Sequence, residues 1–442
     1  MSILDHTPGF NNAEAAQLAK QSYNLDCSAN PLPSERDQNF LLRTDKGERF
    51  VLKIANGAEE HAMLEAQNEA MGYVAKSVSF CPHLIPTTRG EGIATVQSRN
   101  GAKHFVRLVT YLPGMPLGNV KRHSGELLYD LGYKIGQLTN ALQDFDQPAL
   151  HRDFHWDLAN GLVIVHKNEK LVRDKTFREA IFKLTSDFER HATPLLPDLP
   201  QSIIHNDAND YNLLAGGGDD PYTKNQNIVG LIDFGDMVYS YTIGDLAVAI
   251  AYAILDKPDP LATASQIVKG YHSAHPLEES ELTVLFGLVN MRLCMSACIA
   301  AEQQASQPNN AYLGISQEPI RNTLPKLAAI HPRFAEAVFR EACGLRGFPA
   351  SETIVNWLTS HADEFASPLN LNLRAGPVTI LDLSISSPLF SSDPDQNAEP
   401  TLTPRIETAI TEKGAQIGVG RYNEARYFYI NPAFATGDKA TD

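Results

Sequence analysis

Cysteine is scarce in this sequence. Five cysteines occur among 442 residues, an odd number for pairing, and they are scattered along the chain. A small secreted protein stabilised by disulfides needs a dense, even set, so that class is excluded. The first residues, MSILDHTPGF, lack the basic and apolar stretches of a signal peptide. We therefore expect reduced thiols and a cytoplasmic protein.

Positive charge is also in short supply. Lysine and arginine total 37 against 52 aspartates and glutamates, which gives a formal net charge of -15. Such a chain repels nucleic-acid phosphates and anionic lipids at long range, so we expect no nucleic acid and no membrane as a partner. A small cationic substrate is compatible with this charge.

One hydrophobic run, residues 282–301, is long enough to cross a bilayer. Asn290 and Arg292 lie at its centre, where polar and charged groups are costly in lipid. We therefore predict a buried core helix. Cys294 and Cys298 lie four residues apart without a nearby histidine, so we expect them to pack in the core instead of binding a metal.

The spacing of apolar residues divides the chain into three parts. Residues 1–112 combine a short helical pattern at 12–24, four strand patterns, two turn signals (TDKG and RNGA) and a second helical pattern at 59–76, which predicts a small antiparallel sheet carrying a helix. Residues 113–345 are mainly helical in pattern, and residues 346–442 form an extension or linker that is partly β. The helices expected in the middle part are 124–146, 175–192, 244–255, 262–275, 278–304 and 318–343, with short strands at 202–204 and 228–232.

Two polar motifs follow these two short strands. HNDANDYNLL places His205, Asp207 and Asn212 at the spacing of the kinase catalytic loop, and LIDFGD places Asp233 directly before Phe-Gly, as in the kinase metal-binding triplet. Phosphoryl transfer needs a proton acceptor and oxygen ligands for a metal such as Mg²⁺. Either motif alone could be a set of turn residues, since Asn and Asp often bend loops. Together they predict a phosphoryl-transfer site.

The strand FVLKI supplies the lysine that kinases place against the nucleotide phosphates. Strand alternation allows Lys53 to face one side of the sheet while its apolar neighbours face the other. Its helix partner is open: Glu65 and Glu69 are candidates, but Gln67 falls near the position expected for the glutamate.

Other polar residues near these motifs have structural and functional alternatives. We expect His205 to be a packed, hydrogen-bonded histidine that shapes the loop. Asp210 could contact substrate or lie in solvent. In HRDFHWDLAN, Trp156 and Asp157 could enclose a cationic amine, or the segment could be a solvated loop anchored by one buried Trp. Asp245 could be a helix N-terminal acid stabilised by the helix dipole.

The chain resembles the aminoglycoside-phosphotransferase-like branch of the protein-kinase-like fold, and within it the hydroxylysine kinases. The resemblance rests on PLPSERDQNFLL, FVLKIAN, VRLVTYLPG, HRDFHWDLAN, HNDANDYNLL, LIDFGDM and DLAVAIAYA, in family order over residues 30 to about 345. It implies an α+β, bilobal fold with a small antiparallel-sheet N-lobe and a mainly helical C-lobe. It also implies Asp207 as catalytic base, Asn212 and Asp233 as Mg²⁺ ligands, and Lys53 as a phosphate contact.

The resemblance further implies where a nucleotide would lie. Its base would bond the hinge backbone around Thr110 to Leu112, and Ser34 and Asn39 would cover the phosphates in place of a glycine-rich loop. The resemblance suggests that Asp245 braces the catalytic loop. It allows Arg292 to face a substrate carboxylate, although a structural ion pair is an equal alternative.

We predict a kinase that uses ATP or GTP to phosphorylate the hydroxyl of a small amino alcohol or hydroxylated amino acid, hydroxylysine-like or ethanolamine-like. Hydroxylysine kinases use GTP, but the hinge residues of this sequence do not distinguish an adenine from a guanine nucleotide. The alternatives are a catalytically inactive nucleotide-binding module and an aminoglycoside- or homoserine-type phosphotransferase.

The end of the sequence carries a second resemblance. QIGVGRYNEARYFYINPAF is similar to the connector that follows this kinase domain in long bacterial fusions with a peptidase-like module and a class III aminotransferase. A PLP enzyme could eliminate the phosphate that the kinase installs. This resemblance predicts a functional link to a PLP-dependent phospholyase or aminotransferase-like enzyme.

Overall fold

The computed structural model describes residues 7–34, 36–99, 101–218, 224–306, 317–361, 378–382, 416–423 and 425–431. Contacts divide the chain into two compact units, Met1–Asp157 with Gln201–Asp245, and Leu158–Pro200 with Leu246–Asp442. These divisions fall at other positions than the domains predicted at 1–112, 113–345 and 346–442, which stay predictions.

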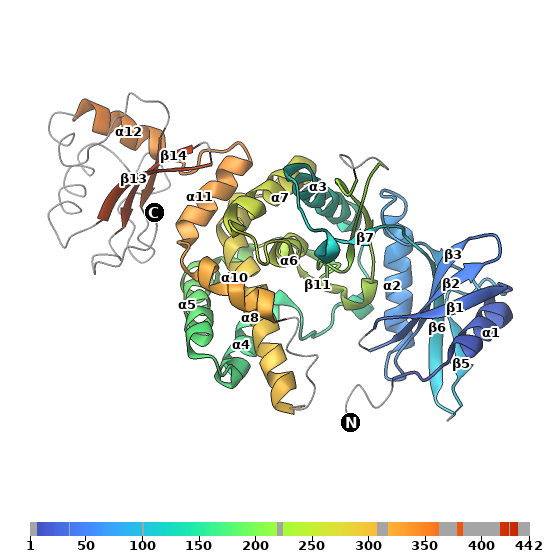
Figure 1. Ribbon diagram of the computed structural model, residues 1–442. Coiled ribbons are helices and arrows are strands. Elements are labelled where there is room, and N and C mark those ends of the chain that lie inside the picture. Colours follow the sequence, from blue (N-terminus) through green and yellow to red (C-terminus); the bar gives the residue numbers. More distant parts are fainter. Residues whose placement is uncertain are drawn as a thin grey trace. The chain divides into compact units, whose positions relative to one another are not determined.

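The first unit contains an antiparallel sheet with helices on its two faces (Figure 1). Its strand order is β1-β2-β3-β6-β4, with β5 also paired to β6. The strands are β1 (Cys27–Leu32), β2 (Gln38–Thr44), β3 (Arg49–Ile54), β4 (Leu84–Ile85), β5 (Ala94–Gln97) and β6 (Lys103–Thr110), and the helices are α1 (Asn12–Tyr23) and α2 (His61–Val74). The predicted small antiparallel sheet is therefore confirmed.

Alternation along the strands separates an apolar face from a polar one. Alternate residues of β2, β3 and β6, such as Phe40, Leu52 and Leu108, pack with α1 into one core cluster. The intervening residues point to the opposite face. There the register aligns Asn39 with Lys53 and Lys53 with Arg107 in one cross-strand row.

The rest of this unit carries the two motifs predicted to be catalytic and metal-binding. Helix α3 (Gly125–Leu142) begins after Ser124, whose side chain caps it by accepting from the Leu127 N–H. Two small sheets follow, with orders β10-β9-β7 and β11-β8. Their strands are β7 (Met115–Pro116), β8 (Gln201–Ile204), β9 (Leu213–Gly216), β10 (Asn227–Leu231) and β11 (Val238–Tyr241).

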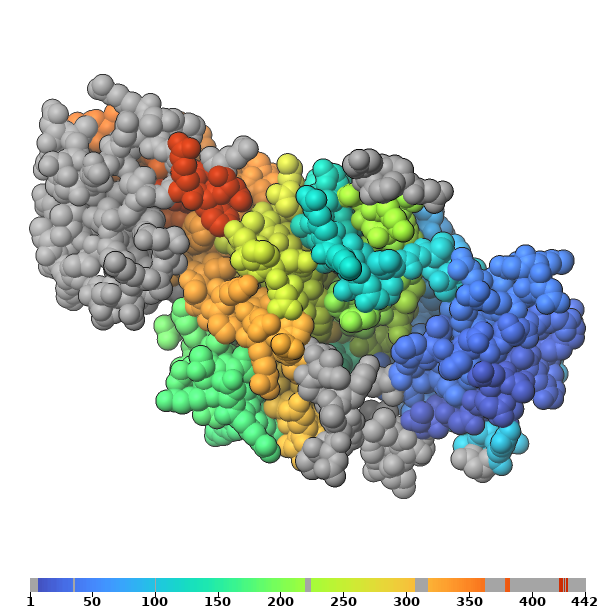
Figure 2. All heavy atoms as spheres, viewed as in Figure 1, coloured from blue at the N-terminus to red at the C-terminus, as the bar shows by residue number. Residues whose placement is uncertain are grey.

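The second unit is built around one long helix, α8 (Glu279–Ser306). It is long and apolar enough to cross a membrane, but 89% of its most apolar window is buried inside the protein, which confirms the predicted core helix. In Figure 2 the segment of α4 and α5 (green) lies against the α8 and α10 segments (orange). The helices that contact α8 are α4 (Gly161–Asn168), α5 (Lys175–His191), α10 (Glu318–Ala328) and α11 (Pro332–Ala342). Helices α6 (Gly244–Ala253) and α7 (Pro260–Ala274) precede α8 in the chain.

The helix predicted over 318–343 is wrong as a single element, because the chain forms α10 and α11 there. Pro332 is the first residue of α11, and a proline disfavours helical backbone at the residue before it. That residue, His331, is extended and its side chain caps α11 by accepting from the Arg333 N–H. The break is thus a local effect of Pro332.

Beyond α11 the described residues form α12 (Ser351–Ser360) and a small sheet. Strand β12 (Thr379–Asp382) pairs in parallel with β14 (Ala425–Asn431), which pairs antiparallel with β13 (Gln416–Tyr422). Residues 362–377, 383–415, 424 and 432–442 of the predicted extension lie outside the described residues, and its assignment as an extension or linker stays a prediction.

Candidate active site

The candidate catalytic loop, which carries the HNDANDYNLL motif, runs between the end of β8 at Ile204 and the start of β9 at Leu213. Asp245 holds its first turn: the His205 and Asn206 N–H groups donate to the two carboxylate oxygens of Asp245 at 3.0 and 2.7 Å. Asn206 is left-handed, with φ 65°, a conformation that asparagine tolerates better than most residues. Asp245, only 1% exposed, therefore braces the loop just before Asp207.

His205 is buried and packs edge-on against Phe234, with ring centroids 4.9 Å apart. Its Nδ1 accepts the Asp207 N–H at 3.3 Å, so the proton of the neutral ring lies on Nε2. Burial lowers the pKa of His205, against the raising effect of Asp245 and Asp233. This is the packed, loop-shaping role predicted for it.

Amide side chains of its own loop hold the Asp207 carboxylate. Asn209 Nδ2 donates to Asp207 Oδ1 at 2.9 Å, and Asn212 Nδ2 donates to Asp207 Oδ2 at 2.7 Å and to the Asp207 carbonyl at 2.9 Å. The orientation of the carboxylate is therefore set within one short loop. Because the amide nitrogen of Asn212 donates to Asp207, the amide oxygen of Asn212 points away from Asp207.

The two candidate metal ligands lie at neighbouring strand ends. Leu213 pairs with Leu231, and the pairing continues one step further, where the Ile232 N–H donates to the Asn212 carbonyl at 3.0 Å. Asp233 follows directly. Among the described residues no group of three or more His, Cys, Asp or Glu side chains could hold a metal, but one amide and one carboxylate oxygen suit Mg²⁺, which keeps several waters and phosphate ligands.

Lys53 reaches Asp233 across 180 residues of sequence, with Nζ 2.8 Å from Oδ1. The Lys53 ammonium holds the pKa of Asp233 well below its usual range, although burial opposes this. The Asp233 side chain is still 45% exposed. A carboxylate that stays ionised and accessible is what a cation site requires.

The predicted helix partners of Lys53 lie elsewhere. Glu65 pairs with His61 at 3.3 Å, and both side chains are about half exposed, while Glu69 accepts from Gln147. Gln67 is buried and its Nε2 lies 3.4 Å from the Gly235 carbonyl. Asp233 is thus the carboxylate that Lys53 contacts, and the structure does not bring Glu65 to it.

Three arginines near this site were missed by the sequence reasoning. Arg107, aligned with Lys53, is 5% exposed and donates to Asn68 Oδ1 at 3.1 Å, and burial lowers its pKa. The sequence signal for Arg107 was a charged residue within the apolar strand pattern KHFVRLVTYL. The others fix the loop after Asp233: Arg36 Nη2 lies 2.5 Å from Asp236 Oδ1, and Arg152 donates to the carbonyls of residues 235 and 237 at 2.9–3.1 Å.

The predicted nucleotide contacts are placed as follows. Ser34 is exposed in the turn between β1 and β2. Asn39 lies beside Lys53 in the cross-strand row, and its Oδ1 is buried without a hydrogen-bond partner among the described residues. Thr110 ends β6 and exchanges hydrogen bonds with the backbone of His83. Leu112 lies two residues after Thr110 and is half-buried.

The predicted substrate-side residues fall into two groups. The Asp210 carbonyl accepts from the Gly118 N–H at 2.8 Å, and a Cβ at residue 118 would lie 2.6 Å from Asp210 Oδ2. Trp156 packs on a small apolar cluster, and Asp157, 6% exposed, accepts from Ser240 Oγ at 2.5 Å. Phe154 and Asp157 are buried whereas Trp156 is only partly buried, so the tryptophan is not the buried anchor that the loop alternative predicted for the 151–160 segment.

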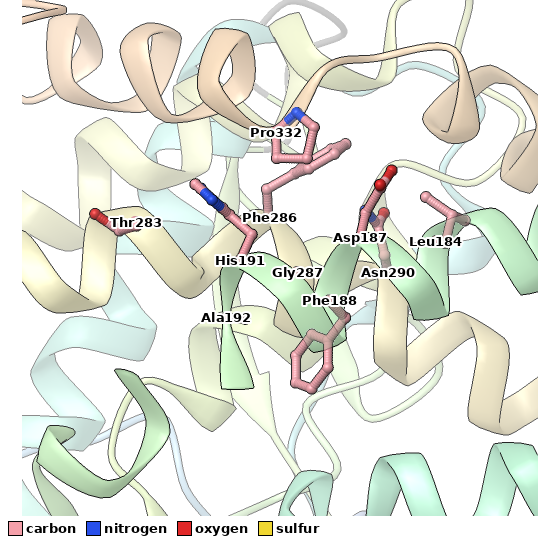
Figure 3. Close-up of a pocket in the computed structure, with 10 residues that line it drawn as sticks. All are labelled: Leu184, Asp187, Phe188, His191, Ala192, Thr283, Phe286, Gly287, Asn290 and Pro332. Atoms are coloured by element: carbon pink, nitrogen blue, oxygen red, sulfur yellow. The ribbon is translucent and has the colours of Figure 1, made fainter. Parts of the chain in front are cut away.

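Arg292 belongs to the second unit. It is 2% exposed on α8, and its guanidinium lies 5.7 Å from the ring centroid of Tyr252. A small cavity in the same unit, between α5 and α8, is lined by polar side chains that include Asp187, His191 and Asn290 (Figure 3). None of the predicted site residues lines it.

Three comparisons with known proteins agree with this geometry. The model of the phosphotransferase enzyme family matches residues 28–282. Hydroxylysine kinase of Danio rerio is 30% identical over 327 residues, covering 72% of this chain and 91% of the relative. A microcompartment-associated aminopropanol kinase has a TM-score of 0.54 at 18% identity, covering 75% of this chain and 98% of its own.

A second solved structure, an amicoumacin kinase in complex with AMP-PNP, Ca²⁺ and Ami, has a TM-score of 0.54 at 14% identity, covering 72% of this chain and 94% of its own. At these identities the structural matches establish the fold alone. The predicted α+β, protein-kinase-like fold class is confirmed.

Proposed function

This chain belongs to the phosphotransferase enzyme family and transfers a phosphoryl group to an alcohol, and from that premise we propose that its acceptor is a small amino alcohol or hydroxylated amino acid of the hydroxylysine type. The observation that carries the proposal is the Asp207 carboxylate, held by two loop amides, one of which belongs to Asn212 beside the Lys53–Asp233 ion pair. The named substrates of the Danio rerio relative and of the aminopropanol kinase support the choice of acceptor.

In the proposed reaction Asp207 orients the acceptor hydroxyl and takes its proton. The hydroxyl oxygen forms a bond to the γ-phosphorus while the bond from that phosphorus to the β–γ bridging oxygen breaks, and the nucleoside diphosphate leaves. General-base assistance of this kind contributes roughly 10²- to 10⁴-fold. The proton then passes from Asp207 to solvent.

The donor is proposed to be ATP or GTP with Mg²⁺. Asn212 and Asp233 would hold the metal, which neutralises charge on the terminal phosphates when bound, and Lys53 would contact the same phosphates. Ser34 and Asn39 would lie over them. The base would bond the Thr110–Leu112 backbone, where the Leu112 N–H has no partner among the described residues.

On the acceptor side, Asp210 is the residue we propose for the substrate ammonium, because it belongs to the catalytic loop itself. Glu65 as a nucleotide contact and Trp156, Asp157 and Arg292 as substrate contacts stay predictions. The link to a PLP-dependent enzyme likewise stays a prediction.

A coupled turnover assay tests the proposal. The purified chain is assayed with Mg²⁺, with ATP and GTP separately, against hydroxylysine, ethanolamine, homoserine and kanamycin. Turnover of hydroxylysine or ethanolamine supports the proposal. Turnover of kanamycin or homoserine alone would contradict the proposed acceptor and identify the chain as an aminoglycoside- or homoserine-type phosphotransferase. Nucleotide-induced thermal stabilisation without turnover of any acceptor would favour an inactive binding module.

The Asp207→Ala variant tests the base. We expect kcat to fall at least about 10²-fold while the thermal shift caused by Mg²⁺-nucleotide is retained, because Asp207 contacts the acceptor and not the donor. Asp144→Ala, an exposed acid of the same unit, is the matched control. A variant that keeps most of its activity would refute the assignment.

A further inference from the structure

The segment HRDFHWDLAN, residues 151–160, packs against the strands that hold both polar motifs. Phe154 forms one apolar cluster with Ile204, the last residue of β8, and Val238, the first residue of β11. Strand β8 leads into the candidate catalytic loop, and β11 follows the turn after Asp233. The start of the segment is therefore anchored next to the candidate metal ligand.

Asp233 has a backbone conformation that needs support. Its φ is 67° and its ψ is 81°, in the left-handed region that residues with a Cβ rarely adopt and keep only where the surrounding structure enforces it. The backbone is fixed on both sides, because the Ile232 N–H donates to the Asn212 carbonyl at 3.0 Å and Val238 begins the pairing of β11 with β8. Residues 234–237 form the turn between these two points. The contacts of this turn decide whether Asp233 keeps its conformation.

Arg152 binds two backbone carbonyls of this turn at once. Its Nη2 donates to the Gly235 carbonyl at 3.0 Å and to the Met237 carbonyl at 2.9 Å, and its Nε donates to the Met237 carbonyl at 3.1 Å. The guanidinium carbon lies 4.2 Å from the ring centroid of Phe154, the residue that packs on β8 and β11. The planar guanidinium thus bridges the turn from an anchored position.

Other side chains contact the same turn less directly. The Nδ2 of Asn206 and the Nε2 of Gln67 lie 3.3 and 3.4 Å from two of its carbonyls. These distances are longer than those of Arg152, and a hydrogen bond from a charged donor is roughly twice as strong as one from a neutral amide. Arg36 pairs with the Asp236 carboxylate, so it restrains a side chain of the turn more than its backbone. We therefore expect the turn to depend mainly on Arg152.

We propose that Arg152 is a positioning residue, which clamps the 234–237 turn and so keeps Asp233 in the left-handed conformation in which its carboxylate meets Lys53. The proposal rests on the proposed function, in which Asp233 holds Mg²⁺. When only a fraction of the molecules has the binding-competent conformation, the apparent affinity falls by that fraction. Loss of the clamp should therefore weaken Mg²⁺ binding and leave the metal-free contacts of the nucleotide intact.

Two substitutions of Arg152 test the clamp by binding and kinetics. Arg152→Met removes the donors and keeps an unbranched side chain, and Arg152→Lys keeps a charge that can bind one carbonyl at a time. We expect Arg152→Met to raise the KM for Mg²⁺ about 10-fold, with kcat at saturating Mg²⁺ little changed. The thermal shift caused by nucleotide in EDTA should equal that of the wild type. Arg152→Lys should lie between the two, and Arg43→Met, at an exposed arginine on β2, is the matched control.

Hydrogen exchange of the metal-free protein tests the clamp without turnover. In Arg152→Met a peptide that covers residues 233–238 should exchange faster than in the wild type, while the peptide that carries Lys53 should exchange at the same rate. Phe234 stays buried against His205, so we expect the variant to fold. If it does not fold, Arg152→Lys against the wild type makes the same comparison.

Three results would overturn the clamp. They are an unchanged KM for Mg²⁺, faster exchange that spreads evenly over the whole unit, and nucleotide binding that weakens in EDTA as much as in Mg²⁺, which would instead make Arg152 a direct nucleotide contact. If the wild type turns over no acceptor, the proposed function fails, while the Mg²⁺-dependent thermal shifts and the exchange rates still decide the clamp. If the wild type is active and Arg152→Met needs no more Mg²⁺, the clamp fails and the proposed function stands.

Discussion

Replacement of Asp245 by Asn is the sharpest test of how this site is built. Asp245 touches neither nucleotide nor acceptor in the proposed mechanism, yet its two oxygens accept the N–H groups of His205 and Asn206. In Asp245→Asn one of these N–H groups faces an NH₂ group in place of an oxygen. The variant therefore removes one buried hydrogen bond with almost no change in shape.

The expected loss of stability follows from the burial of the His205 and Asn206 N–H groups that Asp245 accepts. A buried donor left without a partner costs about 1–3 kcal/mol, so we expect Asp245→Asn to lower the free energy of unfolding by about that amount. Asp245→Ala leaves both donors without these acceptors, for about 2–6 kcal/mol, a large part of a typical total of about 5–15 kcal/mol. A shift of about 1 Å in Asp207 would also lower kcat by about 10²-fold.

Urea unfolding and steady-state kinetics measure the two effects on the same variant. We expect a lower unfolding midpoint and a lower kcat. The nucleotide KM should change less than kcat, because Lys53 lies on a separate sheet and Asn212, the candidate metal ligand of this loop, is also held by the Ile232 N–H. Asp144→Asn is the exposed control. An Asp245→Asn protein with unaltered stability and kcat would refute the argument that Asp245 braces the loop.

Three further predictions follow from single groups. Lys53→Met should raise the nucleotide KM roughly 10- to 100-fold and return the pKa of Asp233 toward its usual range; an unchanged KM contradicts the phosphate role. Burial raises the pKa of Glu281, so its contribution to stability is full below the unfolded value of 4.5 and is lost as pH rises through the higher folded pKa. Glu281→Gln should therefore unfold at a higher temperature than wild type at pH 7 and at an equal one near pH 4, and a gap that widens in acid contradicts this. Burial raises the pKa of Cys81 and Cys298 to about 12, so a thiol reagent should label them only after unfolding, and fast labelling of the native protein would disprove their burial.

Much of the site could be predicted because its information is local. Asp207 and Asn212 lie in one loop, and the spacing that revealed them also produces their hydrogen bond. Alternation placed Lys53 on the polar face of its strand. Helix 279–306 was predictable because a long apolar run with a central arginine suits a protein core better than lipid.

Other features could not be read from the sequence in this way. Glu65 was a reasonable partner for Lys53 by helical spacing, but its position on α2 turns it to His61. The Arg36–Asp236 and Lys53–Asp233 pairs join residues about 200 positions apart. Nothing in either local segment specifies its partner.

The sequence by itself determined the periodicities, the loop motifs and the residue types that can hold a metal or accept a proton, because these depend on neighbours along the chain. Only the tertiary structure decided which carboxylate meets Lys53 and which carboxylate meets Arg36. Strand order and register bring distant segments together, and each charged group then pairs with whatever group lies within reach of its side chain.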